Sequence, residues 1–508
     1  MRVVKCFAIG ACLWGLAHSV AIEPKKPLVD GFYRIPHNIL DYEEGVIVKW
    51  RDAPQLIRSL FFPINVENAW QYMVRSTNSQ GEATGIVGTV LKPYNADSSK
   101  AVVYSYAEDS ASPDCAPSYS ILFGASINTI ALQVESTFMN VLLTKGWYVI
   151  IPDYEGPNAA FTAGRLAGMA TLDSIRGVLS TEAKTNLNPA AKVALWGFSG
   201  GSLPTSWAAL LQPSYAPDLR DTLVGAAFGG WVSNITRTVR FLEGGIFSGF
   251  VASGILGLVS EYPSVQTEIW DFVNQTKIGK LNETVSQCLI QTLLQFPFSE
   301  YFSGDDPYFP TKYELFDRPE VHAMLVDNTI TAKRFEGTPQ IPLFLYHGKP
   351  DEIIPFANAD EGFNVLCEWG VESFEFAASN SSGHIVEYIE GAGAALKWIE
   401  DRFKGNPAIS GCQKTVRSSN LHYPGIDDEY FDILDMNLNA IGFEPLGPSL
   451  MSNNTLTLNT RLSIYDWIVR MIDKIGPIPI KRDELFDADD FEALFGSKYR
   501  LWSDSIIY

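Results

Sequence analysis

The sequence contains few histidines and cysteines and has no excess of positive charge. There are six of each in 508 residues, and no CxxC or CxxH spacing occurs. A structural zinc site is therefore not expected. The formal net charge of −20 excludes the electrostatic attraction by which proteins bind nucleic acids and anionic surfaces. There is no internal repeat or low-complexity tract, and 46% hydrophobic with 19% charged residues is typical of a folded globular protein.

Apolar runs long enough to span a membrane are also missing. At the N-terminus, Arg2 and Lys5 precede the apolar residues 6–17. Residues 19–21 (Ser-Val-Ala) then form a small-x-small cleavage site. We interpret residues 1–21 as a signal peptide, because the apolar part is too short for an anchor. The sequence therefore predicts a secreted protein without a transmembrane anchor.

Four cysteines remain once the signal peptide is removed. An even number in a secreted chain predicts two disulfides, with three possible connectivities. These cysteines are Cys115, Cys288, Cys367 and Cys412. Passage through a glycosylating route is also predicted by Asn-x-Ser/Thr sites. These sites are Asn234, Asn274, Asn282, Asn380 and Asn453.

Short apolar runs rich in β-branched and aromatic residues predict buried parallel strands. The runs are residues 101–106, 147–151, 193–196 and 343–346. Residues 136–145 and 167–180 have the pattern of helices between them. Strands that alternate with helices predict a doubly wound, mostly parallel α/β sheet. In such sheets ligands bind beyond the carboxyl ends of the strands.

A serine lies directly after one of these strands. Residues 197–201 read Gly-Phe-Ser-Gly-Gly and match G-x-S-x-G, in which the serine occupies a sharp turn between a strand and a helix. Glycines on both sides relieve the crowding of such a turn. The pattern predicts that Ser199 is the nucleophile of an α/β-hydrolase.

The acid that assists such a serine follows a later strand. The strand at residues 343–346 runs into His347-Gly-Lys-Pro-Asp351-Glu352. Asp351 stands one turn past the strand and is the predicted acid, with Glu352 as the alternative. His347 ends the strand and is predicted to be structural.

The catalytic histidine comes last in this order. His37 precedes the serine, His322 lies in a helical region, and His422 lies beyond Cys412. His384 follows Ser-Ser-Gly and opens a helical pattern over residues 385–402. The predicted triad is Ser199, Asp351 and His384. An imidazole takes the proton of the serine, and the carboxylate orients the imidazole.

An oxyanion hole requires two hydrogen-bond donors. The backbone N–H of Gly200, the residue after the nucleophile, is one of them. The second is expected in the loop after the strand at residues 101–106, which contains Asp109 and no HGGG sequence. Spacing alone does not assign Asp109 to this role.

The rhythm of the sequence changes between residues 231 and 334, where helical patterns such as 262–273 and 284–294 replace strands. The predicted organisation has five parts. These are a signal peptide (1–21), two parts of a hydrolase core (22–230 and 335–415), an inserted helical cap or lid (231–334), and a C-terminal extension (416–508). The extension contains a helical stripe at 462–475 and an acidic run at 483–492.

With these residues assembled, the chain resembles the fungal secretory lipase family, which includes the A-type lipases of Candida yeasts. The likeness runs from residue 31 to about residue 412. It is carried by Phe62-Pro-Ile-Asn-Val66, Ala107-Glu-Asp109-Ser, Pro152-Asp-Tyr-Glu-Gly156, Trp196-Gly-Phe-Ser-Gly-Gly-Ser-Leu203 and Gly383-His384.

The resemblance implies lipase or esterase activity on acylglycerols, without a metal or organic cofactor. It implies the same triad, and an oxyanion hole at Asp109 and Gly200. It pairs Cys115 with Cys288, and Cys367 with Cys412. It also implies that the uncharged residues 244–260 line an acyl-chain tunnel or form a lid, whereas a plain buried helix is the alternative from the sequence.

The predicted function is a secreted triacylglycerol lipase that acts on lipid esters at an oil–water interface. The alternative is a short-chain (acetyl) esterase that acts on a secondary metabolite. There are two further alternatives. One is a peptidase on the same fold, which nothing in the sequence favours. The other is a binding protein that has lost its triad, which the intact Ser199–Asp351–His384 set opposes.

Overall fold

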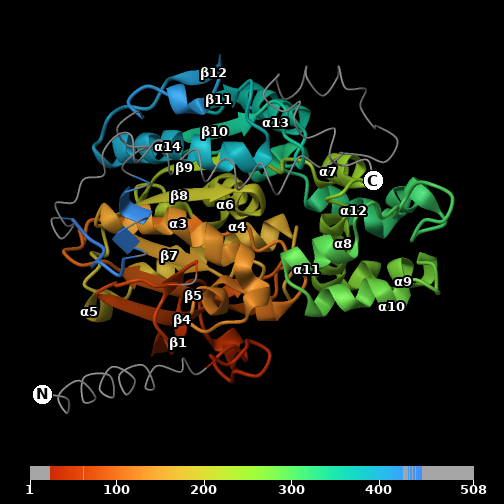
Figure 1. Cartoon of the computed structure of the whole chain (residues 1–508), viewed down its shortest axis with the longest axis horizontal. Coiled ribbons are helices and arrows are strands. Elements are labelled where there is room, and N and C mark those ends of the chain that lie inside the picture. The colour runs from red at the N-terminus through yellow and green to blue at the C-terminus, as the bar shows by residue number, and fades with distance from the viewer. Residues whose placement is uncertain are drawn as a thin grey trace, which may run out of the picture.

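The computed structural model describes residues 23–60 and 62–426, and beyond them residues 433, 435–437, 439–440 and 442–448. Its centre is a ten-stranded sheet in the order β1-β4-β5-β7-β6-β8-β9-β10-β11-β12, which runs from bottom to top in Figure 1. The strands are β1 (Ile47–Asp52), β4 (Asn68–Thr77), β5 (Ala83–Lys92), β6 (Lys100–Ser105), β7 (Tyr148–Pro152), β8 (Lys192–Phe198), β9 (Leu223–Gly229), β10 (Leu343–Gly348), β11 (Ser373–Ser379) and β12 (Gly411–Arg417). A separate antiparallel pair consists of β2 (Arg58–Ser59) and β3 (Phe62–Pro63).

The larger part of the sheet is parallel. All neighbouring pairs from β7 to β12 run parallel, whereas β1, β4, β5 and β7 pair antiparallel. The four strands predicted from apolar runs are confirmed as β6, β7, β8 and β10, because their residues are buried on both faces of the sheet. The predicted mostly parallel α/β architecture is thus confirmed.

Helices cover both faces of the sheet (Figure 1). On one face α3 (Ile130–Thr144) and α14 (His384–Phe403) share a hydrophobic core with the strands. On the other, α4 (Gly164–Leu179), α6 (Ser202–Tyr215) and α13 (Phe356–Glu368) do the same. The short helices α2 (Pro117–Ser120) and α5 (Glu182–Thr185) lie in the connections. The helices predicted at 136–145 and 167–180 are confirmed within α3 and α4.

A helical insertion lies between β9 and β10 and gathers at one end of the sheet, on the right in Figure 1. Its helices are α7 (Ile235–Leu242), α8 (Gly249–Glu261), α9 (Pro263–Phe272), α10 (Ile278–Asn282), α11 (Leu289–Gln295) and α12 (Pro319–Asp327). Apolar side chains from these helices form a core of their own. No strand occurs in the described residues 230–342. We call this insertion the cap and retain residues 231–334 as its proposed bounds.

One predicted helix of the cap is wrong in its first part. The pattern at 284–294 is divided into the 3₁₀ turn η6 (Glu283–Ser286) and α11. Gln287 and Cys288 between them are extended, and Cys288 is bonded to Cys115. The predicted helix is therefore interrupted at the bonded Cys288, where the backbone is extended.

Two disulfides connect distant parts of the chain. Cys115–Cys288 joins the loop after β6 to the cap, and Cys367–Cys412 joins α13 to β12. The bonded residues are 173 and 45 positions apart. Loops of this size give roughly 4–5 kcal/mol of stabilisation per bond by the chain-entropy model. Both pairs are those that the family resemblance implied.

The start of the C-terminal extension lies against the core. Leu446 is buried, its N–H donates to the carbonyl of Asn65, and its carbonyl accepts from the N–H of Tyr94, at 2.9 Å in both cases. The signal peptide, the stripe at 462–475 and the acidic run at 483–492 lie outside the described residues.

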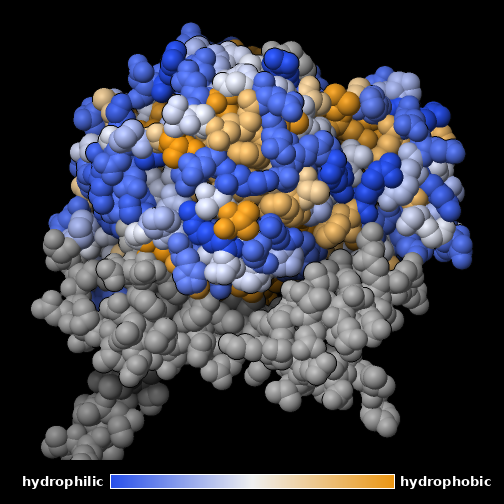
Figure 2. Space-filling view, turned by 90° about the horizontal axis from the view of Figure 1, so that it is seen from above, coloured by the Kyte–Doolittle hydropathy of each residue, from blue (hydrophilic) through white to orange (hydrophobic). Residues whose placement is uncertain are grey.

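The outer surface over β11 and β12 is mostly hydrophilic, with smaller hydrophobic areas between the polar side chains (Figure 2). Within the part of the chain that the structure describes, no helix combines the length and apolar character needed to cross a membrane.

Candidate active site

Ser199 lies in a strained turn between β8 and α6. Its φ angle is 53°, a left-handed conformation that serines rarely adopt. The turn is tight because the chain reverses against itself. A Cβ atom added to Gly197 would lie 2.0 Å from the carbonyl oxygen of Gly201, and one added to Gly201 would lie 2.0 Å from that of Ser105. Only glycine fits at these two positions, which explains the pattern around Ser199 physically.

The structure brings Ser199, His384 and Asp351 together at the carboxyl ends of the strands. Ser199 follows β8, Asp351 follows β10, and His384 begins α14 after β11. The distance from Ser199 Oγ to His384 Nε2 is 2.8 Å, and His384 Nδ1 lies 2.8 Å from Asp351 Oδ2. All three residues are buried. The hydroxyl can donate to the ring, and the ring N–H can donate to the carboxylate.

Asp351 is held in the ionised form by three hydrogen-bond donors, the N–H groups of Ile353 and Ile354 and the ring of His384. Its Oδ1 accepts the N–H groups of Ile353 and Ile354, at 2.9 and 2.7 Å. Its Oδ2 faces His384 Nδ1 and also His347 Nε2, the latter at 3.2 Å. Burial raises the pKa of Asp351, but its charge interaction with His384 and these hydrogen bonds outweigh burial and lower it below its ordinary value.

His347, predicted only to be structural, contacts the acid directly. Its Nδ1 accepts the N–H of Trp231 at 3.2 Å, so the ring proton lies on Nε2. Nε2 then donates to the carbonyl of Ile354, at 3.0 Å, while lying close to Asp351. Burial lowers the pKa of His347. His347 is therefore a neutral ring that supports the loop carrying Asp351.

Glu352, the alternative acid, contacts the backbone of His384 instead of its ring. Its Oε2 accepts the N–H of His384 at 2.6 Å, and its Oε1 accepts that of Ile385 at 3.4 Å. A carboxylate at the start of a 20-residue helix satisfies free N–H groups and is stabilised by the helix dipole. Glu352 thus fixes the position at which α14 begins.

The protonation of His384 reflects its acidic surroundings. Burial alone would lower its pKa, but the negative charges of Asp351, Glu352 and Asp109 and the hydrogen bond that the ring donates to Asp351 raise it above its ordinary value. The ring is therefore a stronger base than a free imidazole and holds a transferred proton well.

Asp109 lies against the other side of the nucleophile turn. A Cβ atom added to Gly200 would lie 1.8 Å from Asp109 Oδ1, so the carboxyl group packs directly on this glycine. Asp109 also has a left-handed backbone, with a φ angle of 50°. Burial raises the pKa of Asp109 to about 7, and interaction with charged His384 opposes the rise. A carboxyl group with this pKa carries a proton for part of the time at neutral pH.

The loop that carries Asp109 is fixed by neighbours that the sequence reading did not single out. Both carboxylate oxygens of Glu135 accept the N–H of Ala107, at 3.0 and 3.2 Å. The hydroxyl of Tyr154 donates to the carbonyl of Tyr106, at 2.8 Å. Two segments that carry the family resemblance, one around residue 108 and one around residue 154, meet here. Contacts between these two segments therefore support the loop of Asp109.

An apolar cavity runs from the serine into the cap. Ser199, Gly200 and Asp109 line one end. Leu258 and Phe250 of α8 and Met324 of α12 are among the apolar residues that line the remainder. The polar side chains among the described lining residues are Asp109, Thr162, Ser199 and Thr238. Six residues of the uncharged segment 244–260 reach the cavity, which agrees with the predicted lining role.

The predicted glycosylation sites differ in their exposure. Asn282 and Asn380 are exposed, whereas Asn234 and Asn274 are half-buried. Asn234 caps α7 by accepting the N–H of Arg237, at 3.1 Å. Asn453 lies outside the described residues. Which sites carry a glycan stays a prediction.

Metal-ligating side chains do not gather around the site. Across the residues that the structure describes, no group of three or more His, Cys, Asp or Glu side chains has the arrangement of a metal site. The carboxyl groups of Asp351, Glu352 and Glu135 instead contact backbone N–H groups, a hydroxyl and an imidazole.

The sequence and the structure are both similar to known lipases. A family model described as secretory lipase matches residues 121–411. Lipase 1 of Candida albicans (strain SC5314 / ATCC MYA-2876) is 43% identical over 439 residues, which cover 86% of this chain and 94% of that protein. Lipase 2 of the same strain is 40% identical over 456 residues, covering 90% and 97%.

Among solved structures, Candida antarctica lipase A in its closed state matches with a TM-score of 0.72 and 29% identity, over 85% of this chain and 100% of that chain. The rice cell wall degrading esterase LipA from Xanthomonas oryzae, at 13% identity and a TM-score of 0.53 over 72% of this chain and 100% of that chain, shares the fold alone. The resemblance found in the sequence is confirmed: the chain belongs to the secretory lipase family of carboxylic ester hydrolases.

Proposed function

We propose that the protein is a secreted triacylglycerol lipase that uses Ser199, His384 and Asp351 through an acyl-enzyme intermediate. The observation that carries this proposal is the continuous chain of 2.8 Å contacts from Ser199 through His384 to Asp351, placed at the end of an apolar cavity. Hydrolysis of a long-chain ester requires an activated hydroxyl for the ester carbonyl and an apolar cavity for the acyl chain.

In the first half of the reaction, Ser199 Oγ attacks the ester carbonyl while its proton passes to His384 Nε2. The carbonyl oxygen becomes an oxyanion in the tetrahedral intermediate. When the intermediate collapses, the bond to the alcohol oxygen breaks and His384 gives its proton to the leaving glyceride. Asp351 stabilises the imidazolium that exists between these two transfers.

In the second half, His384 takes a proton from water, whose oxygen attacks the acyl-enzyme. Collapse of this second intermediate returns the proton to Ser199 Oγ and releases the fatty acid. The N–H of Gly200 and a donor from Asp109 stabilise the negative oxygen in both halves. We assign the Asp109 donor to its protonated carboxyl, because that group packs on Gly200 and its pKa is raised to about 7.

The lining of the cavity favours an acyl chain as its occupant. Its lining is apolar from the serine through α8 to α12, so burial of each methylene of the acyl chain is favourable by about 0.8 kcal/mol. The names of the relatives also point to lipids, since they are lipases. The predicted signal peptide and the two disulfides support secretion.

Hydrolysis of emulsified triolein, compared with a soluble acetyl ester, tests the proposal. Activity on the emulsion that is lost in Ser199→Ala, while the variant keeps its thermal unfolding temperature, is the expected result. Undiminished hydrolysis by Ser199→Ala would refute the assigned nucleophile. Activity confined to the acetyl ester would instead support the short-chain esterase alternative.

A further inference from the structure

Two segments far apart in the sequence contain no charged residue. Residues 115–134 and residues 284–299 lack Asp, Glu, Lys and Arg, in a chain with 19% charged residues and a formal net charge of −20. The first segment follows the loop of Asp109, and the second includes α11 of the cap. Uncharged stretches of this kind are ordinary in a core, but both of these reach the surface.

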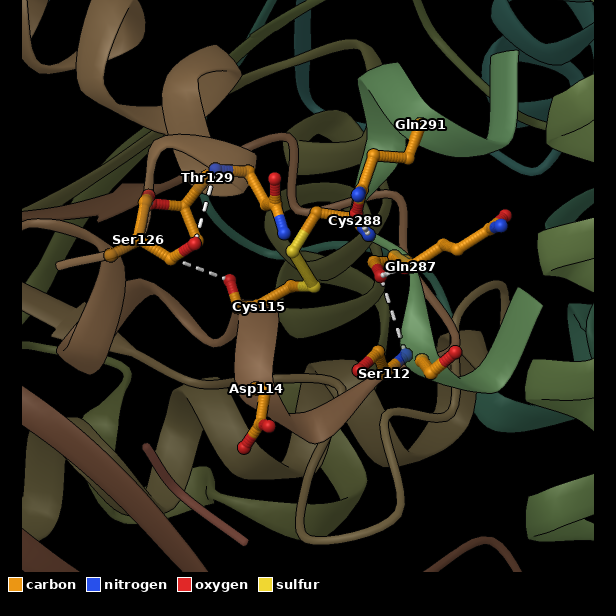
Figure 3. Close-up of a disulfide and its surroundings, with 12 residues drawn as sticks. Ser112, Asp114, Cys115, Ser126, Thr129, Gln287, Cys288 and Gln291 are labelled. Carbon is orange, nitrogen blue, oxygen red and sulfur yellow. Dashed lines mark hydrogen bonds between the residues drawn. A yellow bond between two sulfur atoms is a disulfide. The ribbon is translucent and has the colours of Figure 1, made fainter. Parts of the chain in front are cut away.

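The fold places the two segments side by side. The disulfide Cys115–Cys288 connects them, and α11 packs against both η3 (Ile127–Thr129) and α3. Figure 3 shows Ser126 and Thr129 from the first segment on one side of this bond and Gln291 of α11 on the other. An uncharged segment of the core therefore meets an uncharged segment of the cap at this junction, and the nearest charged residues, Asp114 (Figure 3), Lys280 and Glu283, lie beside it.

The helices of this region expose apolar side chains and bury polar ones. On α11, Leu294 is 77% exposed while Thr292 is buried. On α3, Val134 is 47% exposed while Gln133 is buried and donates to Thr129. Surface helices usually show the opposite arrangement. We name the exposed apolar set the apolar platform; it consists of Ile127, Val134, Val285, Ile290, Leu294 and Phe298.

The apolar platform is attached directly to the candidate active site. The hydroxyl of Ser110, the residue after Asp109, donates to the carbonyl of Gln287 at 2.8 Å. Behind the platform, α11 packs closely on α8, since a Cβ atom at Gly249 would lie 2.8 Å from the carbonyl oxygen of Thr292. The helix α8 lines the apolar cavity. The platform is thus built on the two segments that border the oxyanion loop and the cavity.

We propose that the apolar platform is the surface by which the protein adsorbs to an uncharged lipid phase, such as the surface of a triacylglycerol droplet. This proposal rests on the proposed function, because it names the phase in which that substrate occurs. Contact between exposed apolar side chains and oil is favourable because it removes these side chains from water. This contact requires no charged partner. A second copy of the chain is a poorer partner, since two molecules of formal net charge −20 repel each other.

Adsorption to triolein droplets, measured by flotation with the Ser199→Ala variant, tests the platform without hydrolysis. Leu294→Gln combined with Ile127→Gln removes the two most exposed platform side chains, which are 77% and 61% exposed. We expect adsorption to weaken about tenfold or more. The matched control is Leu40→Gln on η1 (Ile39–Asp41), because Leu40 is also 77% exposed and lies beside β5. The control is expected to adsorb normally.

The same substitutions in the active protein separate this proposal from the proposed function. Hydrolysis of emulsified triolein is expected to fall about tenfold, while hydrolysis of a soluble acetyl ester stays unchanged. Equal adsorption of the platform and control variants would overturn the proposal. A changed sedimentation coefficient of the platform variant with unchanged adsorption would also overturn it, because the platform would then serve self-association. Absence of any esterase activity in the unmodified protein would refute the proposed function, while the flotation result would still decide the platform.

Discussion

Two buried aspartates border the candidate nucleophile, and their surroundings are opposite. Asp351 has three hydrogen-bond donors around its carboxylate, and its pKa is lowered. Asp109 packs on Gly200, its Oδ1 has no hydrogen-bond partner, and burial raises its pKa to about 7. One residue type is thereby prepared as an anion and as a neutral acid within the same site. Both side chains are buried, so the number of hydrogen-bond donors around each carboxyl group, and not burial, determines which aspartate is ionised.

The largest expected effect is on the Asp351 side. Asp351→Asn removes the charge that stabilises the His384 imidazolium and presents an amide to its Nδ1, which favours the wrong tautomer. We expect kcat on a soluble ester to fall about 10⁴-fold. Steady-state kinetics with active-site titration check this, and Glu352→Gln is the matched control because Glu352 forms its hydrogen bonds with backbone N–H groups of α14 and not with the ring of His384. A similar loss in both variants would contradict the assignment of Asp351.

Substitution of Asp109 has the next largest expected effect. Asp109→Ala removes the side-chain donor, and we expect kcat/KM to fall about 10²- to 10³-fold. Asp109→Asn keeps an N–H donor at the same place, so its loss is expected to be within about tenfold. Equal activity of the Ala and Asn variants on a soluble ester would show that the backbone, and not the carboxyl, is the donor at this position.

The pH dependence of kcat/KM sharpens the same comparison. His384 must be neutral to accept a proton, and its pKa is raised above its ordinary value. Asp109 must be protonated to donate, and its pKa is raised to about 7. Activity is therefore expected to rise with pH as His384 loses its proton and to decline as Asp109 loses its own. In Asp109→Asn the alkaline decline is expected to disappear; a decline that persists there belongs to another group.

The smallest effect is expected at His347, whose ring supports the loop that carries Asp351. His347→Gln retains a donor for the carbonyl of Ile354 and an acceptor for the N–H of Trp231, whereas His347→Leu retains neither. Each such hydrogen bond is worth about 0.5–1.5 kcal/mol, so we expect kcat/KM to fall about tenfold in the Leu variant and much less in the Gln variant. The Leu variant also replaces the polar Nε2 group that lies 3.2 Å from Asp351 with an apolar side chain. This change makes Asp351 more basic, so the acidic limb of the pH profile should move to higher pH in the Leu variant alone. A merely structural role would lower the unfolding temperature without this shift.

The chemistry of the site was accessible from the sequence where it depends on short segments. Ser199 lies in a turn that only glycines permit, and Asp351 and His384 each follow a strand whose apolar run is easily recognised. Each segment could be read alone, and the order of the three along the chain connected them. The structure places their functional atoms within hydrogen-bond distance.

The supporting residues could not be predicted because their roles depend on atoms distant in sequence. His347 acts through the N–H of Trp231, and Glu352 acts through the N–H of His384. The raised pKa of Asp109 depends on complete burial, which no local pattern reports. The antiparallel strands β4 and β5 were also missed, since polar residues such as Gln71 and Thr89 occur within them and are buried. A tertiary hydrogen bond to the carbonyl of Ser118 satisfies the amide of Gln71, and no local pattern in the sequence predicts it.

The disulfide Cys115–Cys288 has a mechanical consequence for access to the cavity. It holds the Cα atoms of Cys115, in the core, and Cys288, in the cap, 5.6 Å apart, so the cap cannot lift from the core at this edge while the bond is intact. Any opening movement must turn about this point, with the larger displacement at the far end of the cap. The bond thus acts as a pivot, and its reduction would free the edge of the cap that lies beside the loop of Asp109.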